Sequence, residues 1–211
     1  MSQIDKIING MQAAPMPSDY WESSNIEFPE LMVSKTIIQH NNQSVWGHTM
    51  SVIDILTIKN PITLLSGLFH DLGKGYIIPT DDPSLPRFPG HSLESSCIAQ
   101  TTLKKWGASS YFIDRVMRLI CMHMYDIKII PQEKSIRKFI ANVGPDNIDN
   151  WFVLRIADSC SYASHQRYYN RLIEPFRIAI MSYLKQQPSA DQPEFASKDE
   201  IGNICIEGGD C

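Results

Sequence analysis

The hydrophobic residues of this chain recur at three- and four-residue spacing over most of its length, whereas the two-residue alternation of strands is almost absent. Because that spacing places apolar side chains on one face of a helix, the pattern predicts an all-α fold. Prolines and capping residues mark where the helices begin or end. The expected helices are a short amphipathic start at residues 2–11, followed by 29–38, 44–58, 62–72, 91–107, 110–123, 135–142, 148–162 and 175–184.

One long loop and one polar tail interrupt this pattern. Residues 75–90 contain four prolines, too many for regular structure, and loops of this length are often functional. Large apolar residues become few near the end of the chain, so residues 186–211 are expected to form a loosely attached tail. We therefore expect one helical domain at residues 25–185, preceded by a helical lead at residues 1–24.

Composition narrows the class of protein. The 211 residues carry 19 basic and 23 acidic side chains, and a net charge of −4 gives no broad field for holding a long nucleic acid. No apolar run approaches the roughly 18 residues of a membrane span, and the start lacks the layout of a signal peptide, so a cytoplasmic protein without a membrane partner is expected. Five cysteines without a CxxC pair argue against a disulfide framework and a thiolate zinc site. A homo-oligomer stays open.

Histidines and aspartates at core-facing positions predict a metal site. His70 and Asp71 are adjacent at the end of the most apolar helix, where a buried imidazole beside a carboxylate is costly unless something satisfies both. His48 on the preceding helix and Asp158 near the end of a later one also fall on apolar stripes. A single inward histidine is more often a hydrogen-bonded core residue. Two inward histidines and two inward aspartates from three helices together favour a bound divalent ion, with coordination positions left for water.

His91 and His123 are candidates for a second metal position, with the Asp71 carboxylate bridging the two. His123 lies on the apolar stripe of its helix, and His91 starts the helix that follows the proline-rich loop. Four of the six histidines are then ligands. The expected cofactor is one or two divalent ions, and the residue types suit Mn, Mg, Ni, Fe or Zn.

Such ions would lower the pKa of bound water toward neutrality and could hold the oxygens of a phosphate, which is the chemistry of metal-assisted hydrolysis. Asp71 and Lys74 are the candidate catalytic residues. Lys74, one turn beyond Asp71, is placed to neutralise a phosphate oxygen, and the alternative is a cation favoured at a helix C-terminus. Arg87 in the proline-rich loop is a further candidate for binding substrate phosphate, with a solvated side chain as the alternative.

Two more charged residues are candidates for orienting the ligands. Arg155 lies three residues before Asp158 on the same helix face and is expected to orient that carboxylate, or else to form a surface ion pair. Asp126, three residues after His123, is expected to orient that imidazole or to act as a general acid or base. A role in the turn before Pro131 is the alternative.

Several motifs around these residues resemble a known superfamily. Trp-Gly-His48-Thr-Met, Leu-Phe-His70-Asp71-Leu-Gly-Lys and Arg-Ile-Ala-Asp158 resemble the motifs of HD-domain metal-dependent phosphohydrolases. Phe28-Pro-Glu-Leu, Pro-Gly-His91-Ser and Met-His123 are similar to the HD domain that follows the catalytic head in bacterial tRNA nucleotidyltransferases, the CCA-adding enzymes. The resemblance covers about residues 25–185. It implies an HD-domain helical bundle.

The chain lacks the Gly-Ser loop and paired aspartates of a nucleotidyltransferase head, so it resembles the hydrolytic domain alone and is not expected to extend tRNA. The resemblance implies a metal-dependent phosphohydrolase acting on small nucleotides or RNA ends, as a 2′,3′-cyclic phosphodiesterase or phosphatase. The alternatives are a deoxynucleotide triphosphohydrolase or 5′-nucleotidase, an HD-fold di-iron oxygenase with the same ligand order, and a non-catalytic HD scaffold.

Overall fold

The computed structural model describes residues 1–24, 26, 28–39, 42–56, 60–80, 86–160 and 169–186. Within these ranges the regular elements are helices, and the one strand-like feature is an isolated antiparallel bridge between Ile38 and Ser44. The predicted all-α class is therefore confirmed. The predicted tail, apart from Gln186, lies outside the described residues.

The α-helices are α1 (Gln3–Ala13), α2 (Pro17–Ser23), α3 (Pro29–Val33), α4 (Val45–Ile55), α5 (Pro61–Phe69), α6 (His91–Lys105), α7 (Ser110–Met122), α8 (Glu133–Val143), α9 (Ile148–Cys160) and α11 (Glu174–Lys185). The structure also has two 3₁₀-helices, η2 (Leu72–Tyr76) and η3 (Pro145–Asn147), and one π-helix, η4 (Tyr169–Ile173), within the described residues.

Several predicted helices end earlier than expected. The helix predicted to reach residue 38 stops at Val33, because the hydroxyls of Ser34 and Thr36 donate to the carbonyls of Leu31 and Val33, 2.5 and 2.9 Å away. Such side-chain bonds compete with the helical ladder. The helix predicted to run to residue 72 stops at Phe69 and continues as η2. The helix predicted to run to residue 58 stops at Ile55, because Leu56 leaves the helical conformation with φ −67° and ψ 80°. The predicted end at residue 162 lies outside the described residues.

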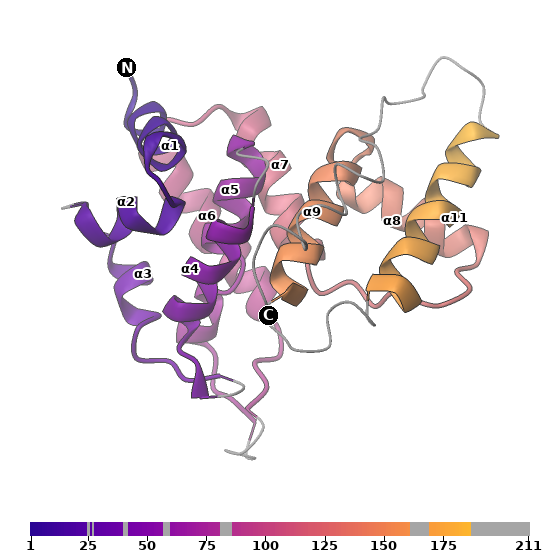
Figure 1. The fold of residues 1–211 in the computed structure, drawn as a ribbon, viewed down its shortest axis with the longest axis horizontal. Helices are drawn as coiled ribbons and strands as arrows, with labels where there is room; N and C mark the ends of the chain where they lie inside the picture. The colour runs from indigo at the N-terminus through magenta and orange to yellow at the C-terminus, as the bar shows by residue number, and fades with distance from the viewer. Residues whose placement is uncertain are drawn as a thin grey trace.

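The helices pack around one core in which α9 is the central connection. It contacts α4, α5 and α7 on one side and α8 on the other, and α11 packs against α8. Figure 1 shows α9 between the group that holds α4 to α7 and the pair α8 and α11. Residues 62–69 of α5, the most apolar helix, are all buried.

The predicted lead at residues 1–24 belongs to the same core. Ile7 and Met11 of α1 are fully buried, and Trp21 of α2 packs with Trp106 at the end of α6. The asparagine and serine caps at Ser2, Ser44, Asn60 and Ser109 each accept a backbone N–H at the start of their helix. Among the described residues, no helix is both long and apolar enough to cross a membrane.

Candidate metal centre

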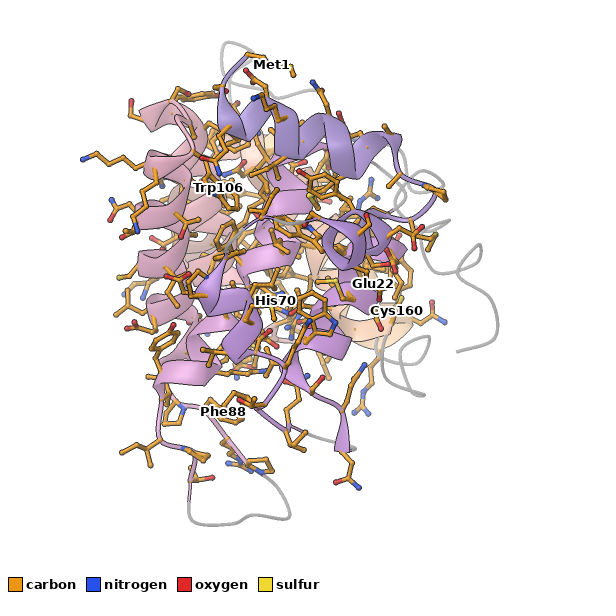
Figure 2. All side chains as sticks on the ribbon, turned by 90° about the vertical axis from the view of Figure 1, so that its left-hand side faces the viewer. Met1, Glu22, His70, Phe88, Trp106 and Cys160 are labelled. Atoms are coloured by element: carbon orange, nitrogen blue, oxygen red, sulfur yellow. The ribbon has the colours of Figure 1, made fainter. Side chains whose placement is uncertain are left out.

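All six predicted ligands converge in the interior, and each comes from a different place in the bundle. They are His48 within α4, His70 at the end of α5, Asp71 before η2, His91 at the start of α6, His123 at the end of α7 and Asp158 in the last turn of α9. Each is at most 9% exposed. Figure 2 shows His70 deep among the surrounding side chains.

The early end of α5 is what aims both residues of the His-Asp pair at the same point. His70 keeps helical dihedral angles, but Asp71 takes φ −111° and ψ −2°, a conformation that is sparsely populated and frequent at active sites. In a continuous helix, adjacent side chains would diverge by about 100°. The break turns the Asp71 carboxylate back toward the imidazole, and His70 Nε2 lies 3.4 Å from Asp71 Oδ2.

One group of donor atoms, which we call the His48 cluster, consists of His48, His70, Asp71 and Asp158. His48 Nε2 lies 3.2 Å from His70 Nε2, 3.1 Å from Asp158 Oδ1 and 3.6 Å from Asp71 Oδ2. Ligands bound about 2.1 Å from one ion lie roughly 3.0 to 3.4 Å apart at angles of about 90° to 109°. The cluster has the spacing of a coordination shell.

The second group, the His91 cluster, consists of Asp71, His91 and His123. His91 Nε2 lies 3.3 Å from Asp71 Oδ1 and 3.2 Å from His123 Nε2, and His123 Nε2 lies 3.7 Å from Asp71 Oδ1. The two oxygens of Asp71 thus face different clusters, Oδ2 toward the His48 cluster and Oδ1 toward the His91 cluster. A carboxylate placed in this way can bridge two ions.

The orientation of three imidazoles tests whether these residues suit a metal. The Nδ1 atoms of His70, His91 and His123 lie 2.6 to 2.7 Å from the carbonyls of Gly67, Phe88 and Ile120. Because a carbonyl only accepts hydrogen bonds, each Nδ1 carries the proton, and in the neutral ring Nε2 presents a lone pair. Lone pairs that converge with two carboxylates in a buried site repel one another unless a cation lies between them. The donor set therefore fits a divalent ion.

The charges of the centre shift several pKa values. Burial works against the charged form of Asp71, but the adjacent His70 and Lys74 outweigh it and hold the pKa of this carboxyl well below its usual range. The pKa of Asp158 is also lowered, because His48 and His70 outweigh its burial. The two carboxylates in turn raise the pKa of His70 against the effect of burial. Burial lowers the pKa of His123.

Lys74 lies at the edge of the His48 cluster. Its Nζ donates to Asp71 Oδ2 at 2.5 Å and to Gln39 Oε1 at 2.6 Å. Gln39, 4% exposed, follows the Ile38–Ser44 bridge and was not among the predicted site residues. It stands in a polar stretch without periodicity, so the sequence offered no sign that its amide would be buried at the centre.

Arg155 joins the two clusters, a wider role than the predicted one. Its Nη1 lies 3.6 Å from Asp158 Oδ2, and it also donates to the His123 carbonyl at 2.8 Å. Trp151, one turn earlier on α9, donates from Nε1 to the Met122 carbonyl at 2.8 Å. These two side chains of α9 therefore hold the last turn of α7 and the His123 ligand with it.

Asp126 is not brought to the centre. Its carboxylate is exposed and pairs with Lys128, while His123 Nδ1 bonds the Ile120 carbonyl and His123 Nε2 faces the cluster. The expectation that Asp126 orients the His123 ring is therefore wrong. The helical backbone at the end of α7 performs that task, which residue spacing alone does not reveal.

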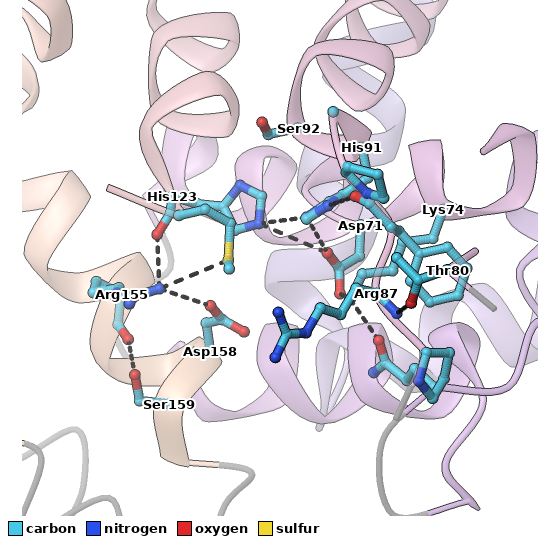
Figure 3. A pocket seen from close by; sticks show the side chains of 16 residues that line it. Asp71, Lys74, Thr80, Arg87, His91, Ser92, His123, Arg155, Asp158 and Ser159 are labelled. Carbon is cyan, nitrogen blue, oxygen red and sulfur yellow. Dashed lines mark hydrogen bonds and ion pairs between the residues drawn. The ribbon is translucent and has the colours of Figure 1, made fainter. Parts of the chain in front are cut away.

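A pocket of about 860 Å³ opens onto both clusters, and its size suits a small organic ligand. Asp71, His91, His123 and Asp158 line it, together with Lys74, Arg87 and Arg155. Figure 3 shows Arg87 reaching into this space from the chain segment before α6. Pro86, Phe88 and Met124 also line the pocket.

Comparison of the chain with protein-family models, with curated proteins and with solved structures finds no match.

Proposed function

We propose that this protein is a metal-dependent phosphohydrolase that acts on nucleotide or RNA-end phosphoesters, with 2′,3′-cyclic phosphodiesterase or phosphatase activity. The observation that supports it most is the Asp71 carboxylate, which is shared between two clusters of donor atoms and lines a pocket that three cations also line. The order of the ligands along the chain supports the assignment of the bundle to the HD-domain class.

The residues of the two clusters would hold the ions. Divalent ions held there would lower the pKa of water toward neutrality and offset charge on phosphate oxygens. Lys74 contributes a positive charge at the same edge, and its contacts with Gln39 and Asp71 fix its ammonium group near the reacting phosphate. Arg155 keeps Asp158 and the end of α7 in place. The burial of the six ligands limits bulk water at the reacting atoms.

The pocket favours hydrolysis of a phosphoester over the di-iron oxygenase alternative. Lys74, Arg87 and Arg155 give the pocket three positive side chains near the clusters, and oxygen binding needs none of them. Phosphate carries its charge on oxygens that arginine and lysine bind well. An RNA end or small nucleotide also suits a pocket of about 860 Å³, whereas the net charge of −4 does not suit a long polyanion.

A metal and substrate panel tests the proposal. Purified protein loaded separately with Mn, Mg, Ni, Fe or Zn is offered 2′,3′-cyclic nucleotides, nucleoside monophosphates, a deoxynucleoside triphosphate and an RNA ending in a 2′,3′-cyclic phosphate. We expect ring opening or phosphate release with at least one metal. Asp71→Asn should lower the rate at least about 100-fold, because it removes the shared ligand charge. Asp114→Asn, an exposed aspartate paired with Arg118, is the matched control.

Other results of these experiments would favour one of the alternative functions. Two bound irons with oxygen consumption and no phosphoester cleavage would favour the oxygenase, and preferred cleavage of the triphosphate would favour a deoxynucleotide triphosphohydrolase. Unchanged cellular function of the metal-free Asp71→Asn protein would favour the scaffold. Failure to cleave any phosphoester with any metal would refute the proposed function.

A further inference from the structure

The three cations that line the pocket differ in what holds them. Lys74 is held by Asp71 and Gln39, and Arg155 by the His123 carbonyl and Asp158. Within the described part of the chain, the guanidinium of Arg87 forms no hydrogen bond or ion pair, and the hydrogen bonds of this residue involve its backbone alone. It is nevertheless directed into the pocket (Figure 3). A cation aimed into a pocket without a protein partner is suited to bind an anionic ligand.

The backbone of Arg87 is fixed at both of its polar atoms. Its N–H donates to Thr80 Oγ1 at 3.2 Å, and its carbonyl accepts from the Thr80 N–H at 3.0 Å. Pro86, the residue before it, has a φ fixed by its own ring. Although the side chain is exposed, its origin is therefore set by the fold.

The same segment is tied to a metal ligand. The Phe88 carbonyl accepts from His91 Nδ1 at 2.7 Å and from the His91 backbone N–H at 3.2 Å. The Phe88 side chain is buried. Arg87 thus stands immediately before the residue whose carbonyl orients a ligand of the His91 cluster. The position of its charge is coupled to the position of the metal centre.

In the proposed function, Lys74 is the cation for the reacting phosphate at the metal centre, because its Nζ donates to the Asp71 carboxylate that both clusters share. The Arg87 side chain forms no hydrogen bond or ion pair with any of the six ligands, and the pocket of about 860 Å³ is far larger than a single phosphate group. The remaining volume suits a ribose and base, with Arg87 placed for a second charge farther along the substrate. In a nucleotide chain that charge is the phosphate on the other side of the same ribose.

We propose that Arg87 forms a second phosphate subsite. It binds the phosphate on the 5′ oxygen of the nucleotide whose 2′,3′ end lies at the metal centre. The inference rests on the proposed function for the identity of the reacting group. It makes Arg87 a specificity-determining residue, because an RNA end carries this second phosphate and a nucleoside 2′,3′-cyclic phosphate with a free 5′ hydroxyl does not. A guanidinium is suited to two-pronged binding of phosphate oxygens.

Binding of two matched nucleotides to the Mn-loaded protein tests this subsite. The probes are adenosine 3′-phosphorothioate and adenosine 3′,5′-bisphosphorothioate, chosen because phosphorothioates are hydrolysed slowly, and calorimetry measures their Kd values. We expect the bis-substituted nucleotide to bind at least about 10-fold more tightly to the wild-type protein. Arg87→Gln should reduce this advantage to about 2-fold or less, and Arg87→Lys should retain part of it.

Arg137→Gln is the matched control, because Arg137 lies on α8, is exposed and does not line the pocket. It should keep the full advantage of the second phosphate. Equal binding of the two probes to the wild-type protein would overturn the proposal. So would an undiminished advantage in Arg87→Gln, because another group would then bind the second phosphate.

Turnover separates this proposal from the proposed function. The kcat/KM values are compared for adenosine 2′,3′-cyclic phosphate with and without a 5′-phosphate. Cleavage of both at equal kcat/KM, with equal binding of the two probes, refutes the subsite and leaves the hydrolase intact. Absence of cleavage with a preserved Arg87-dependent binding advantage refutes the hydrolase and retains the anion subsite.

Discussion

Replacing Gly73 by alanine should damage one cluster of the metal centre and spare the other. Gly73 in η2 lies against the first turn of α6, and its N–H donates to Ser95 Oγ at 2.8 Å. A Cβ at this position would lie 2.4 Å from the His91 carbonyl oxygen and 2.5 Å from the Ser95 backbone nitrogen. Both are backbone atoms, so no side-chain rotation relieves the contact.

The size of the effect follows from this geometry. The His91 carbonyl must withdraw by about 1 Å to reach the 3.4 Å of an ordinary contact, and the first turn of α6 moves with it. Overpacking of this kind costs about 1–3 kcal/mol, which lowers Tm by about 2–4 °C per kcal/mol in a chain of this size. Because His91 begins α6, its imidazole should leave the His91 cluster.

Two measurements check this prediction. Thermal unfolding of the metal-free protein should show the lower Tm of Gly73→Ala, and calorimetric Mn titration should show one tightly bound ion in place of two. Gly47→Ala is the matched control, because it stands next to His48 but its Cβ would meet Ser44 Oγ at 3.4 Å without a clash. The control should be unchanged or more stable by about 0.5–1 kcal/mol. Wild-type Tm and metal binding in Gly73→Ala would show that α6 and the His91 cluster tolerate the added methyl group, contrary to this prediction.

Two further predictions concern the ligands. Arg155→Met removes the donor to the His123 carbonyl at the end of α7, so metal affinity should fall about 10–100-fold. The control Arg137→Met on α8 should leave metal affinity unchanged. Equal Kd values for the two variants in a Mn titration would contradict this prediction. Metal affinity should also fall as the pH is lowered, because a protonated imidazole cannot bind a metal and the pKa of His70 is raised above its ordinary value of 6.5. The pKa of Asp71 is lowered, so this carboxylate stays ionised throughout the range. Apparent Kd measured from pH 8 to pH 5.5 should rise up to about tenfold per unit below the pKa of His70, and a Kd independent of pH would count against the ligand set.

Much of the centre could be predicted from the sequence because helical periodicity reports which side chains face inward. His48, His123 and Asp158 each fall on the apolar stripe of a helix, and the structure brings all three to the centre. Their convergence also needed α4, α7 and α9 to meet, and periodicity does not define how helices pack together.

The parts that the sequence did not predict depend on backbone conformation and on irregular segments. The break at Asp71 is one example, because neither residue of the His-Asp pair is a helix breaker. Gln39 is another, since its burial follows from a bridge in a polar loop. Asp126 has the spacing of an orienting residue, but the chain after α7 leaves the helix and carries its carboxylate to the surface. Spacing arguments hold only while the helix continues.

Anomalous diffraction from crystals of the Mn-loaded protein would test the central claim most directly. We expect two Mn peaks on opposite sides of the Asp71 carboxylate. One should lie among the ligands of the His48 cluster and the other among those of the His91 cluster, about 3.5–4 Å apart. Crystals of Asp71→Asn should show neither peak at full occupancy. Absence of Mn from both clusters in the wild-type protein, or Mn bound only elsewhere, would contradict the account.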